Sequence, residues 1–244
     1  MAEHNRKGEN FPTTQHSIPF GLKSADSAEK TRSLERLTKA YWKPVYKYLR
    51  RKWRKTPAEA EELTQSFFLR AIDKSTFASY DPEQARFRTF VRVCVDRFVV
   101  DQKRHESAIK RGHGVRFLQL DFPGAEGEIS SDHAMLSDPE KLFEVDWVRS
   151  VLGIAVESLR AACANKGKDV HFRVFELFHL GDASEKPSYA EAGAMLGISV
   201  TDVTNRLSYV RREFRVMVLD TLRELTGSEE ELRSEARAVL GVEL

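Results

Sequence analysis

The sequence has few of the features that mark secreted, membrane or metal-binding proteins. Its 244 residues include 2 cysteines, Cys94 and Cys163, which have neither CxxC nor Cys/His spacing. No apolar run is long enough to span a bilayer, and no apolar stretch with a cleavage site follows the N-terminus. These absences predict a cytoplasmic protein with no metal, no cofactor and no membrane insertion.

Catalytic motifs are lacking as well. There is no Gly-rich phosphate loop and no HExxH motif, and the 7 histidines are scattered without the spacing of metal ligands. We therefore expect that the chain is not an enzyme. Alternation of apolar and polar residues, which would indicate strands, is never sustained, so the sequence predicts an all-α fold.

The chain does contain capping residues that mark helix starts, and apolar residues at helical spacing. Residues able to cap a helix start occur at Thr56, Asp81, Asp138, Ser188, Ser199 and Ser228. Apolar residues recur at steps of three and four in 34–53, 63–72 and 87–98. Glycines and a proline interrupt this pattern from Gly112 onward, and the gap, which lasts to about Asp138, is long for a loop inside a domain.

These signals predict two helical domains joined by a flexible acidic linker. The expected segments are a disordered N-terminus (1–24), a first helical domain (25–111), the linker (112–138), a second helical domain (139–226) and a C-terminal helical extension (227–244). The small net charge of +2 conceals an uneven distribution, because 86–116 is strongly basic and 118–138 is acidic. A basic segment of this kind favours a polyanionic partner.

The segment from Ser188 to Met217 has the layout of a helix-turn-helix. A short helix to Leu196, a turn at 197–199 and a second helix from Val200 are expected. In such motifs the start of the second helix meets base edges and its later cations meet phosphates. The candidate base-reading residues are Thr201, Asp202, Thr204, Asn205 and Ser208, and the candidate phosphate contacts are Arg206, Arg211, Arg212 and Arg215. The alternative is an ordinary helical hairpin with a solvated basic face.

Three segments carry a family resemblance. The helix-turn-helix segment resembles the promoter-binding C-terminal region of extracytoplasmic-function (ECF) sigma factors, a subfamily of the sigma-70 family. AEELTQSFFLRAIDK, from Ala60 to Lys74, resembles that family's helix for binding core polymerase. FRTFVRVCVDRFVVDQKR, from Phe87 to Arg104, resembles its promoter-melting helix.

The resemblance implies a transcription initiation factor that binds core RNA polymerase, directs it to specific promoters and assists DNA melting. It makes 25–111 a domain like sigma region 2, which recognises and melts the −10 element, and 139–226 a domain like region 4, which recognises the −35 element. The alternative is a helix-turn-helix regulator that binds duplex DNA without joining polymerase. An anti-sigma factor or another regulator is a further candidate partner.

The resemblance also implies site residues. Contact with the beta-prime clamp of polymerase is expected from Glu61, Glu62, Leu63, Gln65, Phe68 and Arg70. The alternative is that Leu63 and Phe68 are core residues and that the charges form a solvated face. Melting is expected from Phe87, Arg88, Phe90, Arg92, Arg97, Asp101 and Arg104. Phe90 is either core or a platform for an unstacked base. Arg97 stands where the family usually has asparagine, and it can only donate hydrogen bonds.

Two acidic segments leave alternatives open. The linker resembles the family segment that threads through polymerase channels, but an unpaired tether would have the same composition. The acidic start of the C-terminal extension predicts docking on a basic DNA-binding surface, which would be autoinhibitory, or else a plain capping helix.

Overall fold

The computed structural model describes residues 17–73, 76–105, 120–131, 138–181 and 186–241. All regular secondary structure in these residues is helical, which confirms the predicted all-α class. The elements are α1 (Ile18–Gly21), α2 (Ser27–Arg51), α3 (Pro57–Asp73), η1 (Thr76–Ser79), α4 (Phe87–His105), α5 (Phe122–Ser131), α6 (Pro139–Asn165), α7 (Asp169–Phe175), the π-helical turn η2 (Glu176–Leu180), α8 (Tyr189–Leu196), α9 (Val200–Leu225) and α10 (Glu229–Leu240).

Most of the predicted helix starts are confirmed by cap geometry. The side chains of Asp138, Ser188, Ser199 and Ser228 each accept a hydrogen bond from a backbone N–H in the first turn of a helix. Asp81 behaves differently: its carboxylate also accepts from a backbone N–H two positions on, but the residues after it form a turn and not a helix. The helix that follows therefore begins only at α4.

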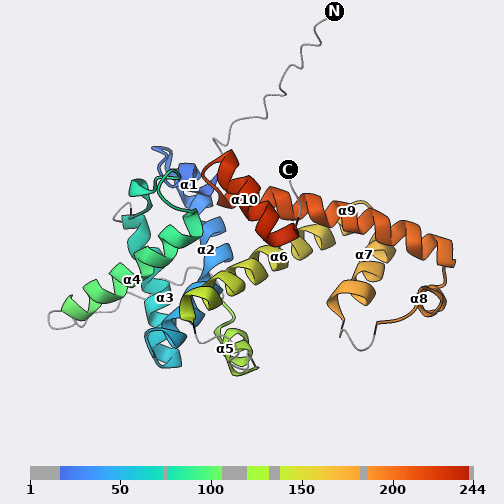
Figure 1. The fold of residues 1–244 in the computed structure, drawn as a ribbon, viewed down its shortest axis with the longest axis horizontal. Helices are drawn as coiled ribbons and strands as arrows, with labels where there is room; N and C mark the ends of the chain where they lie inside the picture. The colour runs from blue at the N-terminus through green and yellow to red at the C-terminus, as the bar shows by residue number, and fades with distance from the viewer. Residues whose placement is uncertain (1–16, 74–75, 106–119, 132–137, 182–185, 242–244) are drawn as a thin grey trace, which may run out of the picture.

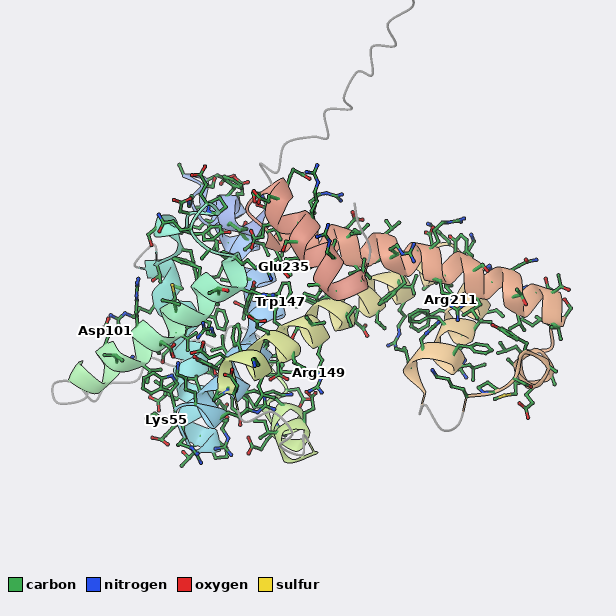
Figure 2. The ribbon with its side chains drawn as sticks, in the orientation of Figure 1. Lys55, Asp101, Trp147, Arg149, Arg211 and Glu235 are labelled. Atoms are coloured by element: carbon green, nitrogen blue, oxygen red, sulfur yellow. The ribbon has the colours of Figure 1, made fainter. Side chains whose placement is uncertain are left out.

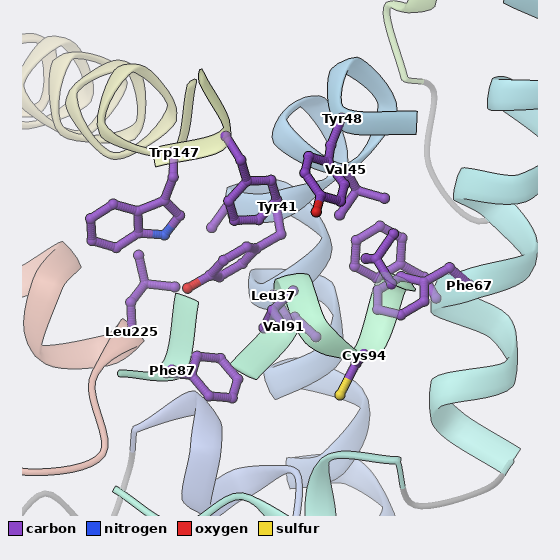
Figure 3. Packing of buried hydrophobic residues seen from close by; sticks show 14 of the residues in the cluster. Leu37, Tyr41, Val45, Tyr48, Phe67, Phe87, Val91, Cys94, Trp147 and Leu225 are labelled. Atoms are coloured by element: carbon purple, nitrogen blue, oxygen red, sulfur yellow. The ribbon is translucent and has the colours of Figure 1, made fainter. Parts of the chain in front are cut away.

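Two hydrophobic cores share the long helices α6 and α9, which run side by side across the molecule (Figure 1). The larger core joins α1 to α5 with the first half of α6, the last half of α9 and α10. The smaller core joins the last half of α6 with α7, α8 and the first half of α9. Figure 3 shows the larger core, where Tyr41 of α2 lies among Phe87 of α4, Trp147 of α6 and Leu225 of α9.

Part of the N-terminal segment differs from the expected disorder. Residues 1–16 lie outside the described part of the chain, but 17–24 includes the short helix α1. Ile18 and Leu22 are buried in the larger core against α2. The segment is short, so the burial of its apolar residues depends on an apolar surface that α2 and α9 supply.

The linker also differs from the expected flexible tether where it is described. Residues 122–131 form α5, and Phe122 packs against Trp42 and Tyr46 with ring centroids 5.4 and 5.1 Å apart. The acidic residues of α5 face the basic residues of α2, so their charge is paired rather than solvated. Glu126 binds Arg50 and Tyr46, and its pKa is lowered chiefly by the hydrogen bond from Arg50.

A buried polar cluster holds α6 to α2. The side chain of Lys47 is fully buried, and its ammonium group lies 3.0 Å from the carboxylate of Asp146 and 2.7 Å from that of Glu128. Asp146 also binds Arg51 at 2.5 Å. Partial burial raises the pKa of Glu128, but hydrogen bonds from Lys43 and Lys47 outweigh it and leave that pKa lowered. The N-terminal half of α6 is thus part of the first helical unit.

Candidate nucleic-acid interface

The end of the molecule formed by α8 and α9 has the geometry of two helices joined by a tight turn. Gly197 ends α8 in the left-handed conformation (φ 65°), and Ser199 caps α9. A Cβ atom on Gly193 would lie 2.8 Å from the carbonyl oxygen of Ile198, so the two helices approach closely only because this residue is glycine. Ala192, Val203 and Leu207 are buried and hold the pair together.

The sequence-predicted DNA-binding residues share the outer face of α9. Eight of the nine are exposed, namely Thr201, Asp202, Thr204, Asn205, Ser208, Arg211, Arg212 and Arg215, while Arg206 is half-buried. Apart from Arg206, the side chains from Thr201 to Ser208 carry no positive charge and the guanidinium groups follow from Arg211 to Arg215, so the positive charge increases away from the turn. An exposed helix face of this kind fits a major groove, with bases near its start and phosphates beyond.

Local contacts orient several of these side chains. Arg211 donates from Nε to Nε2 of His179 at 3.1 Å, and the guanidinium of Arg212 lies over the ring of Tyr209 (5.6 Å). The pKa of His179 is lowered mainly by burial and to a smaller extent by the positive charge of Arg211, so this imidazole remains a neutral acceptor. Ser199 donates to the carboxylate of Asp202 at 2.7 Å, so Asp202 serves the helix cap as well as the exposed face. Figure 2 shows Arg211 on α9, far from α3 and α4.

On α3 the expected polymerase-binding residues divide into two groups. Glu61 and Glu62 are exposed, whereas Leu63 and Phe68 are buried in the larger core. Gln65 is half-buried. Arg70 is half-buried too and lies 3.5 Å from the carboxylate of Asp101 on α4. The two glutamates therefore provide the accessible part of this surface, and the two apolar side chains stabilise the helix beneath it.

The expected melting residues on α4 also divide by burial. Phe87 and Arg88 are buried at the start of the helix, and Phe90 is half-buried against Tyr80 (ring centroids 5.3 Å apart). Arg92 lies 2.7 Å from the carboxylate of Glu140 on α6. Arg97 is exposed and Asp101 half-buried, while Arg104 lies at the helix end with its side chain outside the described residues. In this conformation Arg97 is the expected DNA contact with the most accessible guanidinium on α4 among the described side chains.

A cleft separates α3, η1 and α4. Its lining residues are Phe67, Arg70, Ala71, Thr76, Ser79, Cys94, Arg97, Phe98 and Asp101, and its volume is about 220 Å³. Aromatic rings and guanidinium groups in one cleft suit a planar polar ligand such as a base. Burial raises the pKa of the Cys94 thiol to about 11, so this cysteine is an apolar wall rather than a nucleophile.

Acidic residues facing α4 are the functional candidates that sequence reasoning missed. Glu140 and Glu144 of α6 lie near Arg92 and Arg88, and Glu231 and Glu235 of α10 lie at the helix start. The capping pattern at Ser228 draws attention to Glu231, but no local signal reveals that its partners lie about α4. Such pairings join residues distant in the chain and depend on tertiary packing.

Fold and site together define a helical protein with an exposed basic face on α9 and a cleft beside α4 that contains two arginines. Residues 37–109, from within α2 to beyond the end of α4, match the family model described as Sigma-70 region 2. This match supports a sigma factor of the sigma-70 family, and with it a non-enzymatic role in transcription initiation. Sigma factors of that family bind core RNA polymerase and promoter DNA.

The other comparisons add no relative. No curated protein and no solved structure matched the chain. Within the described residues, no helix is both long enough and apolar enough to cross a membrane.

Proposed function

We propose that this protein is an ECF sigma factor that binds core RNA polymerase, directs it to specific promoters and assists DNA melting. The observation that carries the proposal is the presence of two different surfaces on one chain. The region matching Sigma-70 region 2 contains α3 and α4, and the exposed basic face of α9 lies at the far end of α6. A protein that reads two promoter elements at once needs both.

The proposal assigns a role to each surface. The outer face of α9 reads the −35 element, with Arg211, Arg212 and Arg215 neutralising phosphates. The cleft beside α4 holds the −10 element, and Arg97 is its accessible cation. Glu61 and Glu62 meet the polymerase clamp. Arg92 is held by Glu140 in this conformation, so it becomes a DNA contact when α6 shifts away from α4.

Core binding is the property that separates a sigma factor from a simple duplex-binding regulator. We expect the purified protein to co-elute with bacterial core polymerase in gel filtration. Reversing both accessible charges (Glu61→Lys with Glu62→Lys) is expected to weaken this binding at least about tenfold, since like charges would face the clamp. The matched control is Glu229→Lys with Glu230→Lys, an adjacent exposed glutamate pair on α10.

Promoter selection tests the rest of the proposal. Core polymerase supplemented with the protein should yield run-off transcripts from members of a randomised promoter pool, and core alone should not. If the protein binds duplex DNA but does not bind core polymerase, the alternative function, a regulator that acts without joining polymerase, is favoured. A pull-down from the cytoplasmic fraction of the native host would show whether an anti-sigma factor or another regulator also binds.

A further inference from the structure

The C-terminal helix α10 is built into the larger core. It folds back from the end of α9 toward the start of α4 (Figure 1). Leu232 and Ala236 are buried, and both belong to the core that contains Phe87. The expected docking of this extension on a DNA-binding surface therefore takes a specific form: α10 lies against α4 and not against the basic face of α9.

Glu231 connects three separate points of the chain. Its Oε1 accepts a hydrogen bond from the backbone N–H of Phe87 at 2.6 Å. Its Oε2 accepts from the hydroxyl of Tyr80 at 2.9 Å and from the backbone N–H of Gly227 at 2.7 Å. The residue is 7% exposed, so these bonds form away from water, where carboxylate acceptors are strong. Phe87 is the first residue of α4, and its N–H has no acceptor within the helix.

A second carboxylate holds the next residue of α4. Glu235 lies 2.9 Å from the guanidinium of Arg88, and both side chains are buried. The same guanidinium lies over the ring of Trp147, 4.9 Å from its centroid. Figure 2 shows Glu235 on the side of α10 that faces Trp147. Arg88 is therefore an anchor between α4, α6 and α10 in this conformation.

Two explanations of α10 are open, a removable cover and a permanent support. Removing α10 would expose Leu232 and Ala236 to water and would leave the buried guanidinium of Arg88 without Glu235. It would not uncover a surface prepared for DNA, because Phe87 also packs against Tyr41 and Tyr80 within the core. The contacts thus favour a support.

We propose that Glu231 is a positioning residue for promoter opening. It holds the segment 80–87 and the start of α4 in the position that the separated DNA strand needs when it enters the cleft between α3, η1 and α4. This inference rests on the proposed function. It makes α10 a component of the −10 module, although Glu231 lies 144 residues further along the chain than Phe87. The pKa of Tyr80 is raised far above its ordinary range, mainly by burial and to a smaller extent by the charge of Glu231, so its hydroxyl remains a donor.

Glu231→Gln is the informative substitution. Glutamine has the same shape but one acceptor oxygen, so either the N–H of Phe87 or that of Gly227 then faces an N–H group. Tyr80→Phe removes a single hydrogen bond of the same group. Glu230→Gln is the matched control, since it makes the same chemical change at an exposed position on the same helix.

The experiment measures open-complex formation by permanganate reactivity, using a promoter that the wild-type protein has selected from the randomised pool. We expect Glu231→Gln to reduce the opening of the fully paired promoter by about tenfold or more, and Tyr80→Phe by a smaller factor. On the same promoter with a non-complementary −10 segment, both variants should come within about twofold of wild type, because the strands are already separated. Core binding and duplex binding through α9 should be unchanged, and Glu230→Gln should match wild type throughout.

Each other outcome has a definite meaning. If Glu231→Gln lowers activity equally on paired and pre-opened promoters, the residue is merely structural and the inference fails. If it opens the paired promoter as well as wild type does, the inference fails while the proposed function stands. If wild type itself neither binds core nor opens a promoter, the proposed function fails.

Discussion

Replacing Asp146 by asparagine tests how firmly α6 is held to the larger core. The carboxylate of Asp146 is 2% exposed and lies 3.0 Å from the ammonium of Lys47, whose side chain is fully buried. It also binds Arg51 at 2.5 Å. Asparagine occupies the same volume without the charge, and its amide N–H groups turn toward one of the two cations.

The expected loss follows from the burial of the pair. Neutralising one partner of a buried ion pair costs roughly 3–5 kcal/mol of unfolding free energy, because the other charge remains desolvated. Lys47 keeps Glu128 at 2.7 Å, so we expect the lower end of that range, about 3 kcal/mol. With a urea dependence of roughly 2–3 kcal/mol per molar, the unfolding midpoint should fall by about 1–1.5 M.

Urea unfolding followed by far-UV circular dichroism and by tryptophan fluorescence measures this loss, and agreement of the two signals would establish a single transition. The control is Glu144→Gln, also an acid on α6 paired with a cation of the core, but 51% exposed and 3.7 Å from Arg88. It should cost less than about 1 kcal/mol. If the two variants shift the midpoint equally, the buried cluster does not anchor α6 and the reasoning is refuted.

Three further predictions concern α9, the turn and α5. Arg211→Ala should lower the slope of log affinity against log salt by about one on a selected duplex, and an unchanged slope would remove Arg211 from the phosphate contacts. Gly193→Ala should destabilise the α8–α9 pair more than Gly197→Ala does in thermal unfolding, since the first creates a backbone clash and the second costs only about 1–2 kcal/mol of left-handed strain; equal losses would argue against the close approach. Glu126 and Glu128 have pKa values lowered below their ordinary 4.5, so their pairing stabilises docked α5 above that pH and is lost as the pH falls through the lowered values. The side-chain NMR signals of Glu126 and Glu128 should therefore titrate below pH 4.5, and titration at or above that pH would contradict the pairing.

Local features of the sequence were sufficient to predict most of the helices. A cap at Ser188 or Ser199 binds backbone groups within its own first turn, so its effect is encoded in a few adjacent residues. The same holds for Gly197, whose left-handed conformation ends α8. The exposed face of α9 follows from these boundaries, because helical periodicity decides which side chains point away from the buried ones.

The candidate site on α4 was predicted less completely. The segment 87–98 was expected to be helical from its apolar steps, and the structure has that helix. Whether Arg88 and Arg92 face solvent depends on which helices pack against α4, and Glu235 and Glu140 come from α10 and α6. Arg97 is also an arginine on α4 but remains exposed, so the charge of these residues could not predict which of Arg88, Arg92 and Arg97 is accessible.

By itself, the sequence determined most of the helical segments, with α1 and α5 as exceptions, where most of those helices begin and that a basic polar face runs along the second helix of the turn motif. These properties depend on backbone hydrogen bonds and on residues within a few positions of one another. The tertiary structure alone decided that α5 and α10 belong to the larger core. Their acidic residues have the composition of a solvated tether, and only contact with distant lysines, arginines and the N–H of Phe87 makes burial favourable. Within the linker predicted over 112–138, residues 122–131 therefore form a helix that packs against the larger core.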